Sequence, residues 1–224
     1  MMPATTVLRQ RSRTLVIAAT VPLALAALAD DVRVRRQLQD ARLDPMSGLP
    51  GRADLLAHTS RLLATADRDS VHLIMLDGNG FKAVNDTYGH AAGDAVIRTM
   101  GQRLAHWTDP RQALAARLGG DEFAVTAVLA HQTALADITV LRDLVQQPVH
   151  HDGQTLHLTV SVGIARATDL PGEAADRLLR GADTAMYRVK EGARFSCLAT
   201  TADAYARTVN GRRAGRPGTH LPLA

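Results

Sequence analysis

The stretch that most constrains the fold of this chain is residues 116–125, which read ARLGGDEFAV. Two glycines stand directly before an aspartate and a glutamate, and an apolar run follows at once. Because glycine tolerates the positive φ angles of tight turns, the pair predicts a hairpin turn between strands at about 113–118 and 123–129. Carboxylates at the edge of a core are costly unless a positive group compensates them, so this turn is also a candidate functional site.

The residues around this turn alternate between strand and helix patterns. The run VHLIMLD, which ends at Asp77, predicts a buried strand, and the alternation in TLHLTVSVGIA predicts one long strand over residues 155–165. Helices are expected at about 53–66, 91–106, 133–147 and 172–190, and a last short strand at 195–199. This order predicts an α+β fold, with one antiparallel-rich sheet and helices packed on it.

Length and composition restrict the class of protein. The 224 residues suffice for one domain of roughly 150–180 residues with extensions. The single cysteine, Cys197, excludes an internal disulfide and a cysteine metal cluster. The net charge is +4, but the basic residues are dispersed and lack accompanying aromatic residues, so we expect no nucleic-acid partner. Of the 26 basic residues only Lys82 and Lys190 are lysines, which makes their positions informative.

The N-terminal region combines basic residues with an apolar run. Residues 14–29 carry no charge and would form about 24 Å of helix, which is shorter than a hydrocarbon core of roughly 30 Å, with Pro22 inside. The run favours a membrane anchor, with the folded domain on the cytoplasmic side of the cytoplasmic (inner) membrane. The alternatives are a signal peptide and an apolar helix packed on the domain of a cytoplasmic protein.

The chain divides into four parts at these composition changes. The charged stretch that follows the apolar run reads as a connector helix that pairs two subunits. The C-terminal tail is rich in glycine and arginine, and we expect it to be disordered. The four parts are residues 1–30, 31–43, 44–199 and 200–224.

Carboxylates stand at the ends of two predicted strands. Asp77 closes the first, and Asp121 and Glu122 lie in the hairpin turn. If these strands are neighbours, the carboxylates converge at one edge of the sheet. Oxygen ligands without His or Cys suit Mg²⁺ or Mn²⁺. The competing interpretation is a polar turn whose acids are incidental.

Five segments resemble, in order and approximate spacing, the motifs of the GGDEF family of diguanylate cyclases. They read DPMSGLPGR from Asp44, FKAVNDTYGHAAGD from Phe81, RLGGDEF from Arg117, SVGIA from Ser161 and ADTAMYRVKEGAR from Ala182. The resemblance covers most of residues 44–195. It implies a palm-like, ferredoxin-like fold related to nucleotidyl cyclases, in which two GTP molecules are joined into cyclic di-GMP.

The resemblance also implies roles for the carboxylates. Asp77 would hold Mg²⁺ through its side chain and Gly78 through its backbone carbonyl. Asp121 would be the remaining metal ligand and would deprotonate the attacking 3′-hydroxyl. Glu122 would assist at a second metal.

Further positions match the substrate contacts of the family. Asn85 and Asp94 would read the guanine edge, and Phe81 would offer its backbone N–H to a phosphate. Lys82 and Lys190 match the family's two phosphate lysines, and ammonium groups there would neutralise charge that develops during the reaction. The remaining candidates are Arg194 at the phosphates and Gly119 and Gly120, which allow a phosphate or sugar to approach the backbone.

Two departures from the family pattern concern activity and control. The family usually has an aliphatic residue at position 78 and a second Asp at position 79, whereas this chain has Gly78 and Asn79. The window of the family's inhibitory site, residues 110–113, reads PRQA, so we expect no product-inhibition site and a solvated surface arginine at Arg111.

Because one domain would hold one GTP, the resemblance implies a homodimer. The alternative function is a catalytically silent module that binds GTP and regulates a partner.

Overall fold

The computed structural model describes residues 43–172, 174–192, 196–205, 208–209 and 212–213. Contacts divide the chain into two units, Met1–Leu43 and Asp44–Ala224, and every element described below belongs to the second. The predicted apolar segment at 14–29, nearly all of the connector and the candidate Arg194 lie outside the described residues. Within the described ranges, none of the helices combines the length and the apolar character that a membrane crossing requires.

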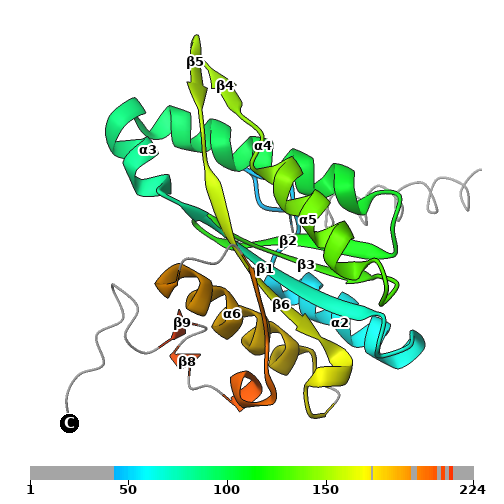
Figure 1. Ribbon diagram of the computed structural model, residues 1–224. Helices are drawn as coiled ribbons and strands as arrows, with labels where there is room; N and C mark the ends of the chain where they lie inside the picture. Colours follow the sequence, from blue (N-terminus) through cyan, green and yellow to red (C-terminus); the bar gives the residue numbers. More distant parts are fainter. Residues whose placement is uncertain (1–42, 173, 193–195, 206–207, 210–211, 214–224) are drawn as a thin grey trace, which may run out of the picture. The chain divides into compact units, whose positions relative to one another are not determined.

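A five-stranded mixed sheet forms the centre of this unit, in the order β2-β3-β1-β6-β7 (Figure 1). Neighbouring strands are antiparallel except β6 and β7, which are parallel. The predicted α+β class is therefore confirmed. The strands are β1 (Val71–Asn79), β2 (Ala113–Gly119), β3 (Glu122–Val128), β6 (Thr159–Arg166) and β7 (Ser196–Leu198).

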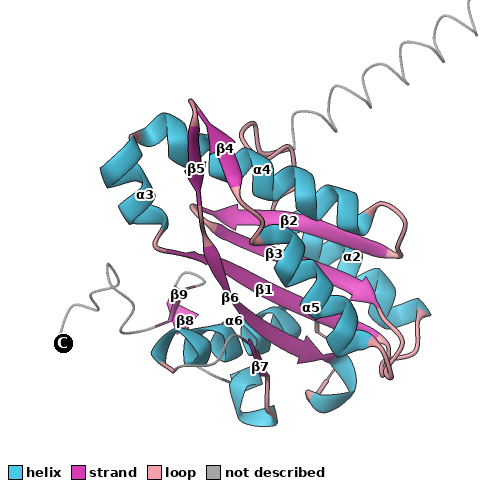
Figure 2. Cartoon of the chain, turned by 45° about the horizontal axis from the view of Figure 1, so that its top comes forward, coloured by secondary structure: helices cyan, strands magenta, loops and turns pink. Residues whose placement is uncertain are grey.

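Helices cover both faces of the sheet (Figure 2). Along β1, Leu73 and Met75 belong to the core formed with α2 (Arg52–Thr65) and α6 (Ala175–Glu191). The alternate residues of β1 belong to the core formed with the helices of the other face. A strand buried on both faces needs a continuous apolar run, which explains VHLIML. The helices of the other face are α4 (His90–Thr108) and α5 (Ala134–Val145), and α3 (Phe81–Tyr88) packs against α4.

Gly163 lets α6 lie directly on the sheet. A Cβ at this position of β6 would overlap the carbonyl oxygen of Ala182 and the backbone nitrogen of Met186, both on α6. This close approach fixes the position of α6, and Lys190 lies in the last turn of that helix.

Two expectations about the C-terminal half were wrong in part. The single strand predicted over 155–165 is broken, because β5 (Gln154–Leu156) turns away to pair with β4 (Val149–His151), while β6 pairs with β1. The tail also begins with a 3-10 helix, η2 (Thr201–Tyr205), although we expected disorder from Thr200.

The buried carboxylate of Asp203 holds η2 in place. It accepts hydrogen bonds from the backbone N–H and hydroxyl of Thr200, and it pairs with Arg188 of α6 at 2.9 Å. The remaining short elements are η1 (Ala167–Asp169), β8 (Thr208–Val209) and β9 (Arg212–Arg213).

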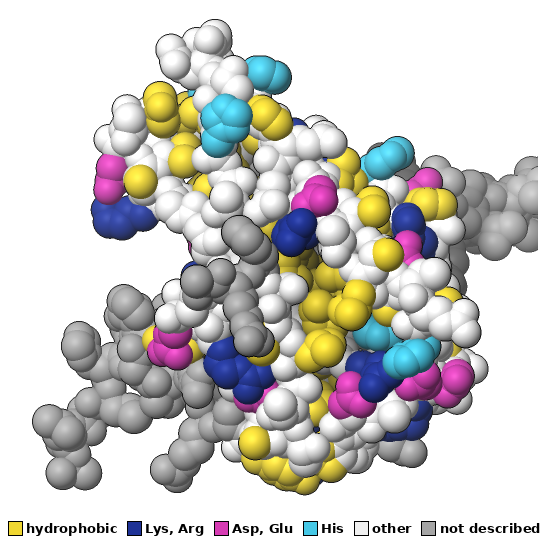
Figure 3. All heavy atoms as spheres, viewed as in Figure 1, with side chains coloured by type: hydrophobic (Ala, Val, Ile, Leu, Met, Phe, Trp, Pro, Cys, Tyr) yellow, Lys and Arg dark blue, Asp and Glu magenta, His cyan; other side chains and the backbone are white. Residues whose placement is uncertain are grey.

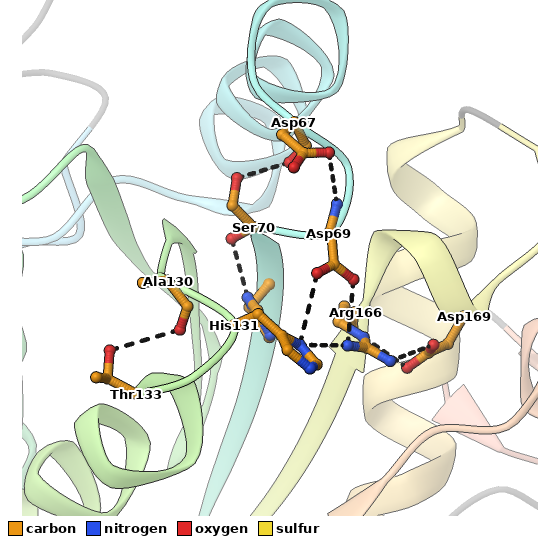
Figure 4. Close-up of polar contacts among 9 residues, drawn as sticks. Asp67, Asp69, Ser70, Ala130, His131, Thr133, Arg166 and Asp169 are labelled. Atoms are coloured by element: carbon orange, nitrogen blue, oxygen red, sulfur yellow. Dashed lines mark hydrogen bonds and ion pairs between the residues drawn. The ribbon is translucent and has the colours of Figure 1, made fainter.

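A polar cluster ties three segments together at the start of β1, the end opposite to Asp77 (Figure 4). The guanidinium of Arg166, at the end of β6, pairs with Asp169 at 2.7 Å and with Asp69 at 3.2 Å. It also contacts His131, which follows β3. Pairing of this kind recurs on the surface, where Figure 3 shows basic side chains beside acidic ones.

Candidate active site

Asp77 lies near the end of the central strand, and its side chain is 1% exposed. In the register of β1 it stands opposite Glu122 of β3 on one side and Ser161 of β6 on the other. Its carboxylate forms an ion pair with the ammonium group of Lys190 from α6. A buried carboxylate is thus compensated by a cation that comes from a different element.

The predicted hairpin turn is confirmed and lies beside Asp77. Gly119 and Gly120 have φ angles of 145° and 54°, in the region that favours glycine. The N–H of Gly78 donates a 3.3 Å hydrogen bond to the carbonyl oxygen of Asp121. A Cβ on Gly78 would lie 3.4 Å from Oδ2 of Asp121, so this carboxylate is directly beside the backbone of β1.

The electrostatics of the turn reflect this crowding of acids. Burial raises the pKa of Asp121, and the nearby charge of Asp77 raises it further, with a smaller contribution from Glu122. The ammonium group of Lys190 acts in the opposite direction, as does a backbone hydrogen bond. The site therefore gathers negative charge that a cation would stabilise.

The residues fit a magnesium ion bound together with phosphate. In the described part of the chain, no three His, Cys, Asp or Glu side chains gather as a complete metal site. Mg²⁺, however, needs just one or two carboxylates when waters and substrate phosphates complete its shell. Asp77 and Asp121, whose carboxylate lies beside the backbone of Gly78, match that requirement.

The predicted substrate residues of α3 lie near the N-terminal part of α4. A Cβ on Gly93 of α4 would overlap Oδ1 of Asn85 and lie 3.2 Å from the ring of Phe81. Asn85 is therefore packed against the residue that precedes Asp94. Because the first N–H groups of a helix have no partner within it, the N–H of Phe81 is oriented to serve an anion. Lys82, in the same turn, is 85% exposed and pairs with Asp86 at 2.6 Å.

A profile of the family described as diguanylate cyclase, GGDEF domain, matches residues 41–195. The chain belongs to the GGDEF domain family. The resemblance found in the five sequence motifs is thereby confirmed.

Two related sequences show how much of the chain the similarity covers. An uncharacterized 19.3 kDa protein of Streptomyces ambofaciens is 42% identical over 173 residues, which cover 77% of this chain and 91% of that protein. Diguanylate cyclase DgcZ of Escherichia coli is 32% identical over 178 residues, which cover 79% of this chain. The chain spans 59% of the length of DgcZ.

Solved GGDEF domains share the fold. The GGDEF domain of TpbB (YfiN) from Pseudomonas aeruginosa has a TM-score of 0.65 at 34% identity, covering 72% of this chain and 96% of that one. The coiled coil and GGDEF domain of DgcB from Caulobacter crescentus, solved in complex with c-di-GMP, also has a TM-score of 0.65. It is 29% identical and covers 80% of this chain and 100% of that one.

The structure of this GGDEF domain adds two residues that the sequence analysis missed, Arg117 and Asp44. Nε and Nη2 of Arg117 donate to the carbonyl oxygen of Gly120 at 3.0 and 2.8 Å, and Nη1 pairs with Asp44 at 2.8 Å. Burial opposes ionisation of Asp44, but hydrogen bonds from Ser47 and Arg117 outweigh it and hold its pKa below the ordinary value. Both residues lie in matched motifs, which was the available signal.

The interpretation of Arg111 as a solvated arginine was wrong. Its guanidinium lies 4.3 Å from the centre of the Trp107 ring, and Nη1 donates to the carbonyl oxygen of Trp107 at 2.7 Å. The flat guanidinium stacks on the indole and caps the end of α4, so this arginine has a structural role.

Proposed function

We propose that this GGDEF domain is a diguanylate cyclase, which condenses two GTP molecules into cyclic di-GMP and two pyrophosphates and acts in cyclic di-GMP signalling. The observation that carries the proposal is the position of Asp121 beside Gly78 and Asp77 at the edge of the sheet. The name of diguanylate cyclase DgcZ supports the same reaction, and the structure of DgcB contains c-di-GMP, the product of that reaction.

Asp121 is suited to move a proton. Its carboxylate lies directly beside the backbone of β1 at the proposed metal site, where it is placed to accept a proton from a bound hydroxyl. In the proposed reaction it takes the proton of the 3′-hydroxyl, whose oxygen then attacks the α-phosphorus of the second GTP and expels pyrophosphate. A divalent cation held by Asp77, Asp121 and the Gly78 carbonyl would neutralise the charge that develops on the phosphoryl oxygens.

Other groups would bind and orient the nucleotide. The N-terminus of α3 offers the N–H of Phe81 to a phosphate, and Lys82, Lys190 and Arg194 supply positive charge. Asn85 and Asp94 offer an amide and a carboxylate, which match the donors and acceptors of a guanine edge.

The reaction needs two domains that face each other, because each 3′-hydroxyl attacks the GTP of the other subunit. We therefore propose a homodimer paired through residues 31–43. We also retain the proposal that residues 14–29 anchor it to the cytoplasmic membrane.

The second candidate function is a silent module that binds GTP without turnover. Asn79 favours this function, because the family usually carries another carboxylate at this position. The Oδ1 atom of Asn79 accepts a hydrogen bond from the hydroxyl of Ser161, and its Nδ2 atom donates one to the hydroxyl of Thr159.

The test is to incubate the full chain with GTP and Mg²⁺ and to separate the nucleotides by chromatography. Cyclic di-GMP formed by the wild type and lost in Asp121→Asn is the expected result. A folded dimer that binds GTP without forming product would instead support the silent module.

A further inference from the structure

The charge balance at Asp77 is maintained by a lysine that the proposed reaction needs elsewhere. Asp77 is 1% exposed, and an uncompensated carboxylate at that depth is strongly unfavourable. Lys190 supplies the compensating charge. The same ammonium group is one of the proposed phosphate ligands, and one ammonium cannot neutralise both groups fully at the same time.

The side chain of Lys190 is placed so that it can exchange one partner for another. It occupies the last turn of α6, and its side chain is 30% exposed, so it reaches both the buried carboxylate and solvent. The helix itself is held against the sheet at Gly163, where a single added carbon would overlap its backbone. Movement is therefore confined to the flexible four-carbon side chain.

We propose that Lys190 is an exchangeable counterion: it neutralises Asp77 in the metal-free domain, and a divalent cation displaces it and so releases its ammonium group to the nucleotide phosphates. This inference rests on the proposed function, because it takes Asp77 as a metal ligand.

The exchange couples the binding of metal and nucleotide. When the cation binds alone, the Asp77–Lys190 pair must break and the ammonium group gains no new carboxylate or phosphate. When nucleotide is present, the released ammonium pairs with a phosphate. Each ligand therefore increases the affinity for the other by the same factor. Binding of metal alone is correspondingly weakened by competition from Lys190.

Lys82 provides a matched control. It is the other lysine of the chain and also pairs with an aspartate, Asp86, at 2.6 Å. That pair is exposed, at 85% and 60%, and exposed pairs contribute little. Replacing Lys82 removes the same charge without freeing a buried carboxylate.

The experiment measures Mn²⁺ binding to the full chain without nucleotide, by calorimetry or by the loss of free-ion electron paramagnetic resonance signal. We expect Lys190→Met to bind Mn²⁺ about tenfold more tightly than the wild type, which is the effect of removing a competitor worth about 1.4 kcal/mol. Lys82→Met should match the wild type. The melting temperature of Lys190→Met should fall in EDTA and recover with Mn²⁺ to a greater extent than in the wild type.

The outcomes separate this inference from the proposed function. Equal or weaker Mn²⁺ binding by folded Lys190→Met overturns the exchange, even if the wild type makes cyclic di-GMP. Absence of Mn²⁺ binding in all three proteins, with and without GTP, overturns the proposed metal site as well. If Lys190→Met does not fold, Lys190→Gln carries the same expectation, and unchanged affinity in that variant overturns the proposal.

Discussion

Substitution of Arg117 tests whether the turn that carries Asp121 is held by its link to the beginning of the domain. The side chains of Arg117 and Asp44 are 14% and 27% exposed. Arg117→Ala removes this ion pair and two bonds to the Gly120 carbonyl. Breaking a fully buried pair costs about 3–5 kcal/mol. Asp44 keeps two hydrogen bonds from Ser47, so we expect a loss of about 2–3 kcal/mol.

The assay is urea unfolding followed by circular dichroism, with Arg98→Ala as the control. Arg98 is an exposed arginine of α4, and its replacement should change the free energy of unfolding by less than about 0.5 kcal/mol. For a domain of this size, the expected loss in Arg117→Ala corresponds to a fall in melting temperature of roughly 4–12 °C. The cyclase activity that we propose should fall as well, because the Gly120 carbonyl fixes the turn that carries Asp121.

The pH dependence gives an independent check on the same pair. The pKa of Asp44 is lowered in the folded state, so its stabilising contribution is present above the ordinary value and is lost as the pH falls through the folded value. The difference in the free energy of unfolding between the wild type and Asp44→Asn should therefore be largest near neutral pH and shrink below about pH 4.

In a double-mutant cycle, the effects of Arg117→Ala and Asp44→Asn on the free energy of unfolding should couple by about 1 kcal/mol or more. A loss below 0.5 kcal/mol in Arg117→Ala, or additive effects of the two changes, would refute the reasoning.

Three further predictions concern packing, the tail and the active-site charge. Gly163→Ala should lower the free energy of unfolding by about 1–3 kcal/mol or more, because α6 must move off the sheet; an unchanged urea midpoint would contradict this. Asp203→Ala should release η2 and speed proteolysis after Thr200, whereas an unchanged digestion pattern would show that Asp203 does not hold η2 in place. Asp121→Asn should be more stable than the wild type at neutral pH in EDTA. The pKa of Asp121 is raised, so the ionised carboxylate lowers the stability of the wild type above that pKa. The stability gained by Asp121→Asn should therefore vanish in acid, and a gain that persists in acid would show that the effect is not electrostatic.

The sequence predicted the elements whose patterns are long or chemically distinctive. The glycine pair marked the turn between β2 and β3, and the apolar run of β1 was long enough to identify it as a strand. By contrast, α3 has 8 residues, which is too short for a helical period to stand out. The hairpin of β4 and β5 did carry a signal. Asp152 and Gly153 have φ angles of 46° and 74°, as an Asp-Gly hairpin turn requires, but two strands of three residues show no alternation.

The acidic residues of the candidate site could be predicted from the sequence, whereas the pairing of its cations could not. Convergence of Asp77 and Asp121 depends on the pairing of β1 with β3, which the sequence analysis left as a condition and the structure shows. The pairing of Lys190 with Asp77 depends on how α6 crosses the sheet, and that crossing is set by the absence of a side chain at Gly163. A close approach of this kind is a tertiary property, because glycine in a strand pattern is equally consistent with a bulge.

The structure also gives a physical account of the two departures from the family pattern. A side chain at position 78 would meet Cδ2 of Leu158 at 3.0 Å, so Gly78 relieves crowding beside Asp121. Asn79 accepts a 2.9 Å hydrogen bond from Ser161, which stands opposite Asp77 in the register. An aspartate there would add another negative charge near an already buried carboxylate. Both departures therefore leave the backbone and carboxylates of the proposed metal site in place, while Asn79 lowers the negative charge that a single cation must compensate.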